Sequence, residues 1–346
     1  MLIRAARIGA ALVVMIAACN GTRPPPRAPL VDSAPISEGD ASGRLVRELE
    51  LEVLASYERT QLDEIAASGV IDPTVGLTVF GVGQDVSVGS APTERWPVTS
   101  VAGAGVDVVS RRLELFLSGD RTVGWSYDDV SLRLPVCGRI ASIPLRVAQV
   151  YVRDSERWTL VAEHAAYAQP MGRWLDAAKG PDGRQVPSAV EKQKESLEAQ
   201  EALGVALSPD GDRAVWDGSA GGLVVWPDPL HVLRAGAARS GPSLAQSLGA
   251  TAVSVEGIRL ALGPGRNLAI ASATVLARLP RTGEGGAATS IDIRVRGTFV
   301  VERVGEIWKV RFALVSTPIT TGALVGRTLG VAASLETGGR VKTSCR

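Results

Sequence analysis

Apolar residues recur at steps of three and four along the chain between Arg44 and Ala67. This spacing places them on one face of an α-helix, and Gly69 follows as a stop signal. We therefore expect an amphipathic helix over residues 44–67. Its apolar stripe comprises Val46, Leu49, Val53, Tyr57, Leu62 and Ile65.

Strand signals follow this helix, and then the same order repeats. Over residues 106–165, β-rich runs are separated by turns such as SGDR and RDSER. A second helix is predicted next, because Ser188 and Glu191 have the spacing of a capping box and KQKESLEAQEAL follows them. Residues 252–315 are again rich in β-formers. The order helix, strands, helix, strands predicts an α+β protein with two similar parts.

Three segments of the first part align without gaps with three of the second, in the same order. The clearest pairing sets VYVRDSERWTLVAEHA on VVERVGEIWKVRFALV and brings Trp158 onto Trp308. The loops differ in length, since the offsets are about 150, 145 and 130 residues. Three matches in one order indicate an internal duplication. The paired ranges are 150–165 with 300–315, 125–135 with 270–280, and 95–98 with 225–228.

Strand periodicity separates the two neighbours Glu163 and His164. Successive strand residues face opposite sides of a sheet, so these side chains are not expected to act together on one substrate. By period two, His164 takes the position of Leu314 in an otherwise apolar row, and Glu163 matches Ala313. A histidine in such a row is usually structural, which leaves His164 as a lone pocket candidate. The two predicted rows are Trp158, Leu160, Ala162 and His164, and Trp308, Val310, Phe312 and Leu314.

The strand around Trp125 has two unlike faces. We expect the more apolar face to pack on a core. The other face either lines a pocket, with Tyr127 and Asp129, or lies at a solvated or interface surface. The more apolar face holds Ser126, Asp128, Val130, Leu132 and Leu134, and the other holds Trp125, Tyr127, Asp129, Ser131 and Arg133. The aligned residues of the second part carry no carboxylate there: Ile270, Ser272, Thr274 and Leu276.

The N-terminus has the features of an export signal. Arg4 and Arg7 precede an apolar run, residues 8–17, that is too short to span a membrane comfortably. Small residues then precede Cys19, and this IAAC ending resembles the bacterial lipobox. The resemblance implies cleavage before Cys19, acylation of that residue and the lipid bilayer as a partner. The alternative is an ordinary signal in which Cys19 is incidental. Because Asn20 is not Asp, the resemblance also implies sorting to the outer membrane, facing the periplasm.

Composition narrows the remaining chemistry. After the predicted signal peptide, residues 1–18, the segment 19–42 is polar, contains five prolines and is typical of an extended tether. A formal net charge of +1 does not indicate a nucleic-acid partner. In an oxidising compartment, Cys137 and Cys345 form either a disulfide or two separate thiols. The sequence has no CxxC, HExxH or helical His pair, so we predict neither a metal nor another cofactor.

Three motifs of the first part resemble the SnoaL-like branch of the nuclear transport factor 2-like superfamily. They are VGSAPTERWP, SGDRTVGWSYDDVSLRL and ERWTLVAEHAAYAQP. The family often has a Gly-Thr-x-x-x-Glu loop, a Gly-Asp-x-x-x-Ala-Trp strand and a final Trp-x-x-x-x-x-His strand. Glu94, Trp125, Trp158 and His164 fall on these positions, within roughly residues 45–170. The second part lacks the Ala-Trp strand and the final His.

The resemblance implies two tandem cone-like domains, each an N-terminal helix packed on a curved antiparallel sheet. Their predicted bounds are 43–170 and, for a degenerate copy, 188–320, with a linker over 171–187 and a tail over 321–346. In this family the cone encloses a pocket, and the sheet commonly mediates pairing, here of the two copies within one chain. The predicted pocket residues are Glu94, Trp96, Trp125, Tyr127, Asp129 and His164.

These features predict a membrane-anchored envelope protein that binds a small apolar molecule or a protein without catalysis, so no catalytic residue is assigned. The alternative is an isomerase- or cyclase-like enzyme, in which an apolar pocket shifts the pKa values of buried carboxylates. A third interpretation is a structural protein whose pocket is filled by Trp96, Trp125 and Trp158. One observation distinguishes these interpretations. An enzyme would have a buried Asp, Glu, Tyr or His in an open pocket with polar atoms converging on it.

Overall fold

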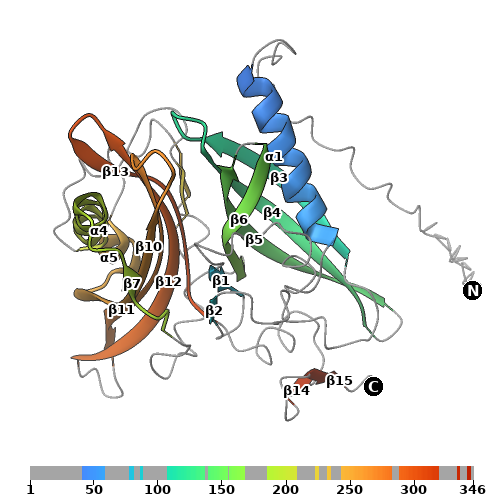
Figure 1. Cartoon of the computed structure of the whole chain (residues 1–346). Coiled ribbons are helices and arrows are strands. Elements are labelled where there is room, and N and C mark those ends of the chain that lie inside the picture. Colours follow the sequence, from blue (N-terminus) through green and yellow to red (C-terminus); the bar gives the residue numbers. More distant parts are fainter. Residues whose placement is uncertain are drawn as a thin grey trace, which may run out of the picture. The chain divides into compact units, whose positions relative to one another are not determined.

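Two large sheets and the helices beside them make up most of the described structure, a computed structural model shown in Figure 1. The chain is a mixture of helix and sheet, mostly sheet, as the sequence predicts. No described helix is long and apolar enough to cross a bilayer. The structure describes residues 41–58, 78–81, 86–88, 107–136, 139–154, 156–167, 185–208, 223–225, 232–234, 243–282, 288–318, 333–335 and 341–343.

The first sheet has six strands in the order β2-β1-β6-β5-β4-β3. Its four long strands form an antiparallel meander, and the short β1 joins the far side of β6 in parallel. Helix α1 (Ala41–Glu58) packs on one face of this sheet (Figure 1). The strands are β1 (Thr78–Phe80), β2 (Val86–Val88), β3 (Asp107–Leu117), β4 (Val123–Val136), β5 (Arg139–Asp154) and β6 (Arg157–Tyr167).

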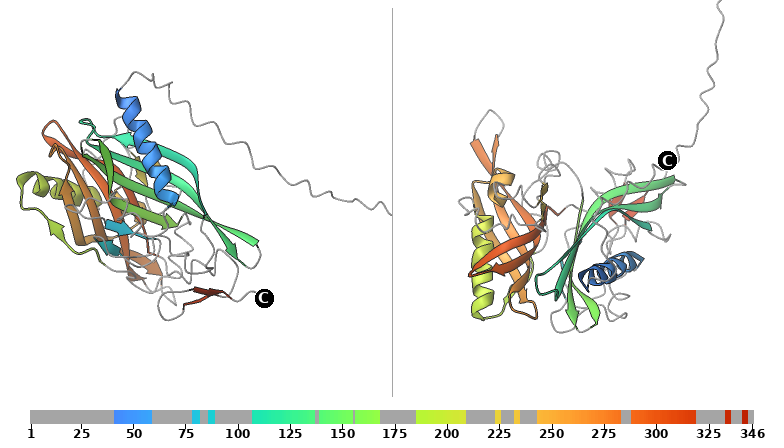
Figure 2. Two further views of the ribbon diagram at one scale, coloured as in Figure 1. Left: turned by 45° about the vertical axis from the view of Figure 1, so that its right-hand side comes forward. Right: turned by 90° about the horizontal axis from the view of Figure 1, so that it is seen from above.

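The second sheet has seven strands in the order β7-β10-β11-β12-β13-β8-β9, and it follows the plan of the first. Again four long antiparallel strands are followed by a short parallel one, β8, beside the last of them. Helix α4 (Lys194–Leu207) covers one face (Figure 2), with α5 (Leu244–Leu248) beside it. The strands are β7 (Ala189–Val190), β8 (Leu223–Val225), β9 (Val232–Arg234), β10 (Ala252–Leu262), β11 (Leu268–Thr282), β12 (Ala288–Val304) and β13 (Ile307–Ser316).

The two sheets also share their irregularities. A β-bulge interrupts β5 and β6 beside Val150, and another interrupts β12 and β13 beside Val300. A further bulge follows Ser110 in β3, and its counterpart follows Val255 in β10. These positions differ by the same offsets of about 150 and 145 residues that align the two parts of the sequence. A separate two-stranded sheet pairs β14 (Ala333–Leu335) with β15 (Val341–Thr343).

The bulges correct the predicted rows of the final strands. In β6, Leu160 pairs with Tyr151 and Ala162 pairs with Val150, so Val161 is an extra residue. An extra residue reverses the alternation of faces beyond it. The prediction that each row shares one face is therefore wrong. Trp308 and Val310 belong to the core beneath α4, whereas Phe312 and Leu314 belong to a second core.

That second core lies between the sheets. It takes most of its residues from strands of both sheets, within the compact unit Glu38–Arg346. Burial of this kind removes large apolar areas from water, which is the main favourable contribution to folding. From the first sheet it includes Val123, Trp125, Tyr127, Ala148, Val150, Val152, Val161 and Ala162, and from the second Leu223, Val225, Leu268, Ile270, Val300, Phe312 and Leu314.

The helices confirm one part of the sequence analysis and correct another. In α1 the predicted residues Leu49, Val53 and Tyr57 are buried as expected; the described helix reaches Glu58, and the predicted continuation over residues 59–67 lies outside the described structure. The capping box predicted at Ser188 is wrong. Residues 189–190 instead pair in parallel with the edge of β10, and the Ile258 amide donates to Ser188 Oγ at 3.3 Å. Backbone pairing with the sheet edge thus delays the start of α4 to Lys194.

Candidate functional site

Polar side chains gather on the face of the first sheet that α1 covers. Six of them are buried, and they come from one helix and three strands. Polar groups are rare in such positions unless they are hydrogen-bonded, because dehydration costs about 1–3 kcal/mol for each unmatched group. We refer to these side chains as the polar cluster. They are Ser56 and Tyr57 on α1, Asp128 on β4, Gln149 and Tyr151 on β5, and Glu163 on β6.

Gln149 is the centre of the polar cluster. Its Nε2 donates to Ser56 Oγ at 2.8 Å and to Glu163 Oε2 at 2.7 Å. Its Oε1 accepts a hydrogen bond from the Tyr151 hydroxyl at 3.0 Å. Ser56 in turn donates to the carbonyl of Val53 at 2.6 Å. The amide therefore connects the helix to two strands and holds the Glu163 carboxylate beneath α1.

Asp128 supplies a second buried carboxyl group in the polar cluster, and its side chain has no exposed surface. Burial raises the pKa of this carboxyl from 3.8 to about 6, although hydrogen bonds from Ser110, the Arg112 amide and Tyr57 oppose the increase. The Arg112 amide donates to Oδ1 at 3.0 Å. A carboxyl group that ionises near neutral pH is suited to exchanging a proton with a bound molecule.

The register of the strands makes the helix-covered faces of the two sheets directly comparable. Asp128 pairs with Leu113 and Val147 on its neighbouring strands, and Ala273 pairs with Ile258 and Gly297 in the same way. At the positions of the second sheet that correspond to the strand residues of the polar cluster, every residue is apolar. Asp128, Gln149, Tyr151 and Glu163 correspond to Ala273, Phe299, Val301 and Ala313, all of which are buried in the core beneath α4.

Two predicted pocket residues lie on the opposite face of β4 from the polar cluster. Trp125 and Tyr127 are buried in the core between the sheets, where Trp125 stacks on Phe116 with ring centroids 5.8 Å apart. Burial raises the pKa of the Tyr127 hydroxyl above its usual value. The sequence analysis left open whether this face lines a pocket or lies at a solvated or interface surface. At Trp125 and Tyr127 it is an interface between the two sheets.

Asp129, the predicted pocket carboxylate, lies at the rim of that interface. Its side chain is 43% exposed, and its Oδ1 is 4.0 Å from Arg146 Nε. The Tyr127 hydroxyl donates to the same oxygen at 2.8 Å. The structure thus brings together Tyr127, Asp129 and Arg146, but it places none of them beside the polar cluster. The more apolar face of the strand is core-facing, as predicted, and its aspartate is the one beneath the helix.

His164 is completely buried between the sheets. Its Nε2 lies 2.7 Å from Ser316 Oγ on β13, and its ring centroid is 5.2 Å from that of Phe80. Burial and the nearby Arg296 guanidinium hold the pKa of the imidazole well below its usual value, so the ring is neutral. Glu163 faces the other side, toward Gln149. The two neighbours are separated by the sheet, and His164 joins one sheet to the other.

Other predicted residues lie outside the described structure or elsewhere in it. Cys19, Glu94, Trp96, Cys137 and Cys345 are outside the described residues, so the lipidation site, the loop candidates and the disulfide stay predictions. Trp158 is buried beside α1. Among the described residues, no group of three or more potential metal ligands comes together.

The polar cluster could not be found from strand periodicity alone. The sequence assigned Asp128 to a core-facing row, and aspartate in that row was the available signal. Its partners were hidden because Ser56 and Gln149 are 93 residues apart in the sequence. Only the packing of α1 on the first sheet brings them together.

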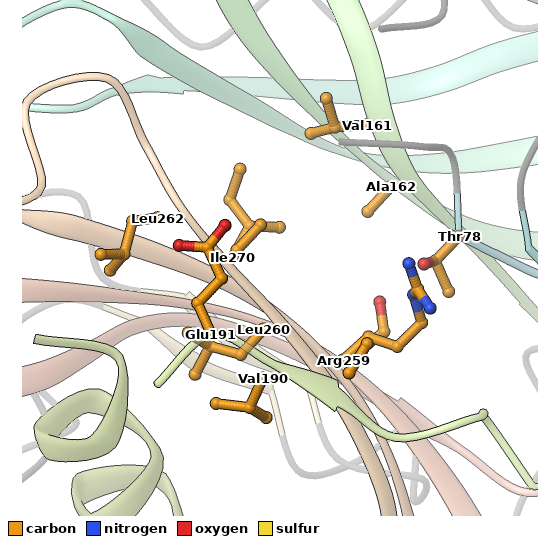
Figure 3. Close-up of a pocket in the computed structure, with 12 residues that line it drawn as sticks. Thr78, Val161, Ala162, Val190, Glu191, Arg259, Leu260, Leu262 and Ile270 are labelled. Carbon is orange, nitrogen blue, oxygen red and sulfur yellow. The ribbon is translucent and has the colours of Figure 1, made fainter. Parts of the chain in front are cut away.

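A cavity of about 440 Å³ lies on the inner side of β10 and β11, facing β1 and β6 (Figure 3). It is lined by Val161 and Ala162 of the first sheet and by Leu260 and Ile270 of the second. None of the four predicted pocket residues that the structure describes, Trp125, Tyr127, Asp129 and His164, lines it. It is separate from the polar cluster, which lies on the other face of the first sheet.

No protein-family model matches the sequence, and no curated protein matches it. Several solved structures are similar to part of the chain. Aln2 from a Streptomyces species is 15% identical, with a TM-score of 0.28, over 37% of this chain and 94% of that chain. An NTF2-like protein with a cystatin-like fold from Novosphingobium aromaticivorans is 17% identical, with a TM-score of 0.30, over 39% and 92%. The association domain of CaMKII from C. elegans is 12% identical, with a TM-score of 0.27, over 36% and 95%. Similarity at this level does not assign the chain to a family.

Proposed function

We propose that this protein is a lipid-anchored envelope protein whose first half binds a small molecule beneath α1. In this proposal the polar cluster recognises the ligand. The second half is a degenerate copy of the same nuclear transport factor 2-like cone, filled by side chains. The matching strand orders and matching bulges of the two sheets support the duplication.

The observation that carries the proposal is the contrast between equivalent positions. The second sheet is built with Ala273, Phe299 and Ala313 where the first has Asp128, Gln149 and Glu163. The fold therefore does not require polar residues there. Buried carboxyl groups lower stability unless they are well paired, and sites that keep such residues are commonly functional.

The surroundings indicate what kind of molecule would bind. Leu49, Val53 and Leu160 are buried apolar residues on the same side of the sheet, whereas Asp128 and Glu163 are acceptors when ionised. A mostly apolar molecule with one or two hydroxyl or amine donors complements that combination. Binding of such a molecule without chemical change is the first function that we propose.

A second candidate is proton transfer next to a carbonyl group, as in an isomerase or cyclase. The observation that favours it is the pKa of Asp128, which burial raises to about 6. A carboxyl group with this pKa is mostly ionised at pH 7, where it can accept a proton, and it holds that proton better than an ordinary aspartate does. In that case Asp128 would be the base, and kcat/KM of the wild-type chain would rise with pH through about 6.

The membrane anchor is part of the same proposal. The IAAC sequence ending at Cys19 and the proline-rich segment behind it support acylation and an extended tether. Metabolic labelling with radioactive palmitate should label the wild-type chain in the membrane fraction. The Cys19→Ser variant should lose the label and leave that fraction, and a labelled or membrane-bound variant would contradict anchoring through Cys19.

Native mass spectrometry of the full chain, released from membranes in a mild detergent, tests the binding function. We expect a small molecule of defined mass on the wild type and its loss from Asp128→Ala and Glu163→Ala. His164→Leu changes the other face of the sheet and should keep the ligand, which makes it the matched control. A ligand retained by both alanine variants, or lost only from the control, would overturn the assignment to the polar cluster.

A further inference from the structure

The cavity between the sheets has a chemical character of its own. Both sheets contribute apolar side chains to its walls, with Val161 and Ala162 facing Val190, Leu260 and Ile270. Polar side chains stand at separate places along it. In Figure 3, Arg259 extends toward Thr78, whereas the Glu191 carboxylate lies well away from that guanidinium, near Ile270.

The first sheet shows why the cavity is open. Ser272 lines it, and the register of the strands sets Ser272 in the position of Tyr127. Tyr127 pairs with Glu114 and Ala148, and Ser272 pairs with Arg259 and Thr298 in the same way. In the first sheet the tyrosine ring fills the space and belongs to the shared core. A serine leaves that volume empty in the second sheet.

Arg259 is the group that most needs a partner. No hydrogen bond or ion pair joins its side chain to any residue in the described parts of the chain. Its side chain is partly removed from water, and a guanidinium in such a place binds a carboxylate through two parallel hydrogen bonds. Glu191 has a hydrogen-bonding partner, since Gln193 Nε2 donates to it at 2.8 Å. Arg259 is therefore the charged group of this cavity whose hydrogen-bonding capacity is unused in the described structure, and Glu191 keeps its negative charge.

We infer that this cavity is a second binding site, which takes an amphipathic monocarboxylate of the fatty-acid type. The carboxylate pairs with Arg259 and accepts from the Thr78 hydroxyl, and the hydrocarbon chain lies against Leu260 and Ile270 toward Glu191. A second carboxylate at the far end of the ligand meets Glu191 and is repelled. The site therefore discriminates against dicarboxylic acids of the same length.

Isothermal titration of the full chain in detergent with decanoate tests this site. We expect binding by the wild type and affinity reduced about tenfold or more in Arg259→Gln, which loses a charge-assisted hydrogen bond. Ser272→Tyr, which restores the residue of the first sheet, should abolish binding. Decanol, without the charge, should bind more weakly than decanoate. Decanedioate should bind poorly to the wild type and better to Glu191→Gln.

Two controls keep the outcome interpretable. Thermal unfolding of Ser272→Tyr shows whether that variant folds. Arg259→Gln tests the site without this risk, because the Arg259 side chain has no partner to lose in the described structure. Glu163→Ala should leave decanoate binding unchanged, which separates this site from the polar cluster. The inference is overturned if the wild type does not bind decanoate, if Arg259→Gln binds as tightly as the wild type, or if Glu163→Ala abolishes binding.

Discussion

The helix-covered faces of the two sheets have the same architecture and different chemistry. Beneath α4 the second sheet is apolar at every position equivalent to a strand residue of the polar cluster. Beneath α1 the first sheet buries Asp128, Gln149, Tyr151 and Glu163 at those positions. The same strand order thus accommodates polar or apolar residues at these positions. The fold therefore does not need the polar ones. The difference separates residues that build the sheet from residues that give its face a chemical character.

The strongest test of the contrast is to put a carboxyl group of the first sheet into the second. In Ala273→Asp the new side chain enters the apolar core beneath α4. We expect a loss of roughly 3–5 kcal/mol in the free energy of unfolding at neutral pH. Ala273→Val adds bulk without charge and should cost about 1–3 kcal/mol. Urea denaturation measures both, and equal losses would mean that charge is not what distinguishes the two faces.

The pH dependence of Asp128 gives the next largest effect. The folded carboxyl keeps its proton up to a pKa of about 6, whereas the unfolded one releases it near 3.8, so stability falls as pH rises between these values. The fall amounts to about 3 kcal/mol. Asp128→Asn should remove it. Asp129→Asn, one residue along and half-exposed, should keep it. Urea denaturation from pH 4 to pH 7 checks this, and an unchanged slope in Asp128→Asn would contradict the buried-carboxyl assignment.

Gly124 tests how closely α1 approaches its sheet. A Cβ atom there would lie 2.7 Å from Leu49 Cδ2 and 3.2 Å from the Trp158 ring, whereas the equivalent residue of the second sheet is Ala269. Gly124→Ala should therefore displace the helix and lower stability by about 1–2 kcal/mol. The reverse change, Ala269→Gly, should cost less, roughly 1 kcal/mol. Thermal unfolding compares the two, and a stabilised Gly124→Ala would show that α1 has room to move.

The smallest expected effect concerns His164, the polar residue between the sheets. The folded imidazole stays neutral, whereas the unfolded one gains a proton below about pH 6.5, so stability is lost on acidification. His164→Leu, carrying the residue of position 314, should remove this loss and change stability at pH 7 by about 1 kcal/mol. Ser316→Ala should keep the acid sensitivity. The free energy of unfolding at pH 5 and at pH 7 distinguishes the two variants. If His164→Leu loses as much stability on acidification as the wild type does, His164 is not the cause.

Sequence patterns predicted the order of elements because apolar spacing along Leu49, Val53 and Tyr57 is a local property of the chain. They failed beyond Val161 because a bulge is set by the pairing of two strands, and valine is an ordinary strand residue. The sequence pointed to Asp129 rather than Asp128 for a related reason. Both faces of β4 are buried, one beneath α1 and one against the second sheet. Periodicity separates the two faces but does not show on which of them an aspartate meets polar partners.

The most direct test of the central claim is the free energy of unfolding of one triple variant. Gln149→Leu, Tyr151→Phe and Glu163→Ala together replace three mutually bonded members of the polar cluster, and Ser56, which loses the Gln149 donor, still donates to the Val53 carbonyl. If these residues are kept for binding, urea denaturation at pH 7 should give an unfolding free energy equal to or above that of the wild type. A fall of about 3 kcal/mol or more would contradict the claim, since the cluster would then be holding the first sheet and α1 together.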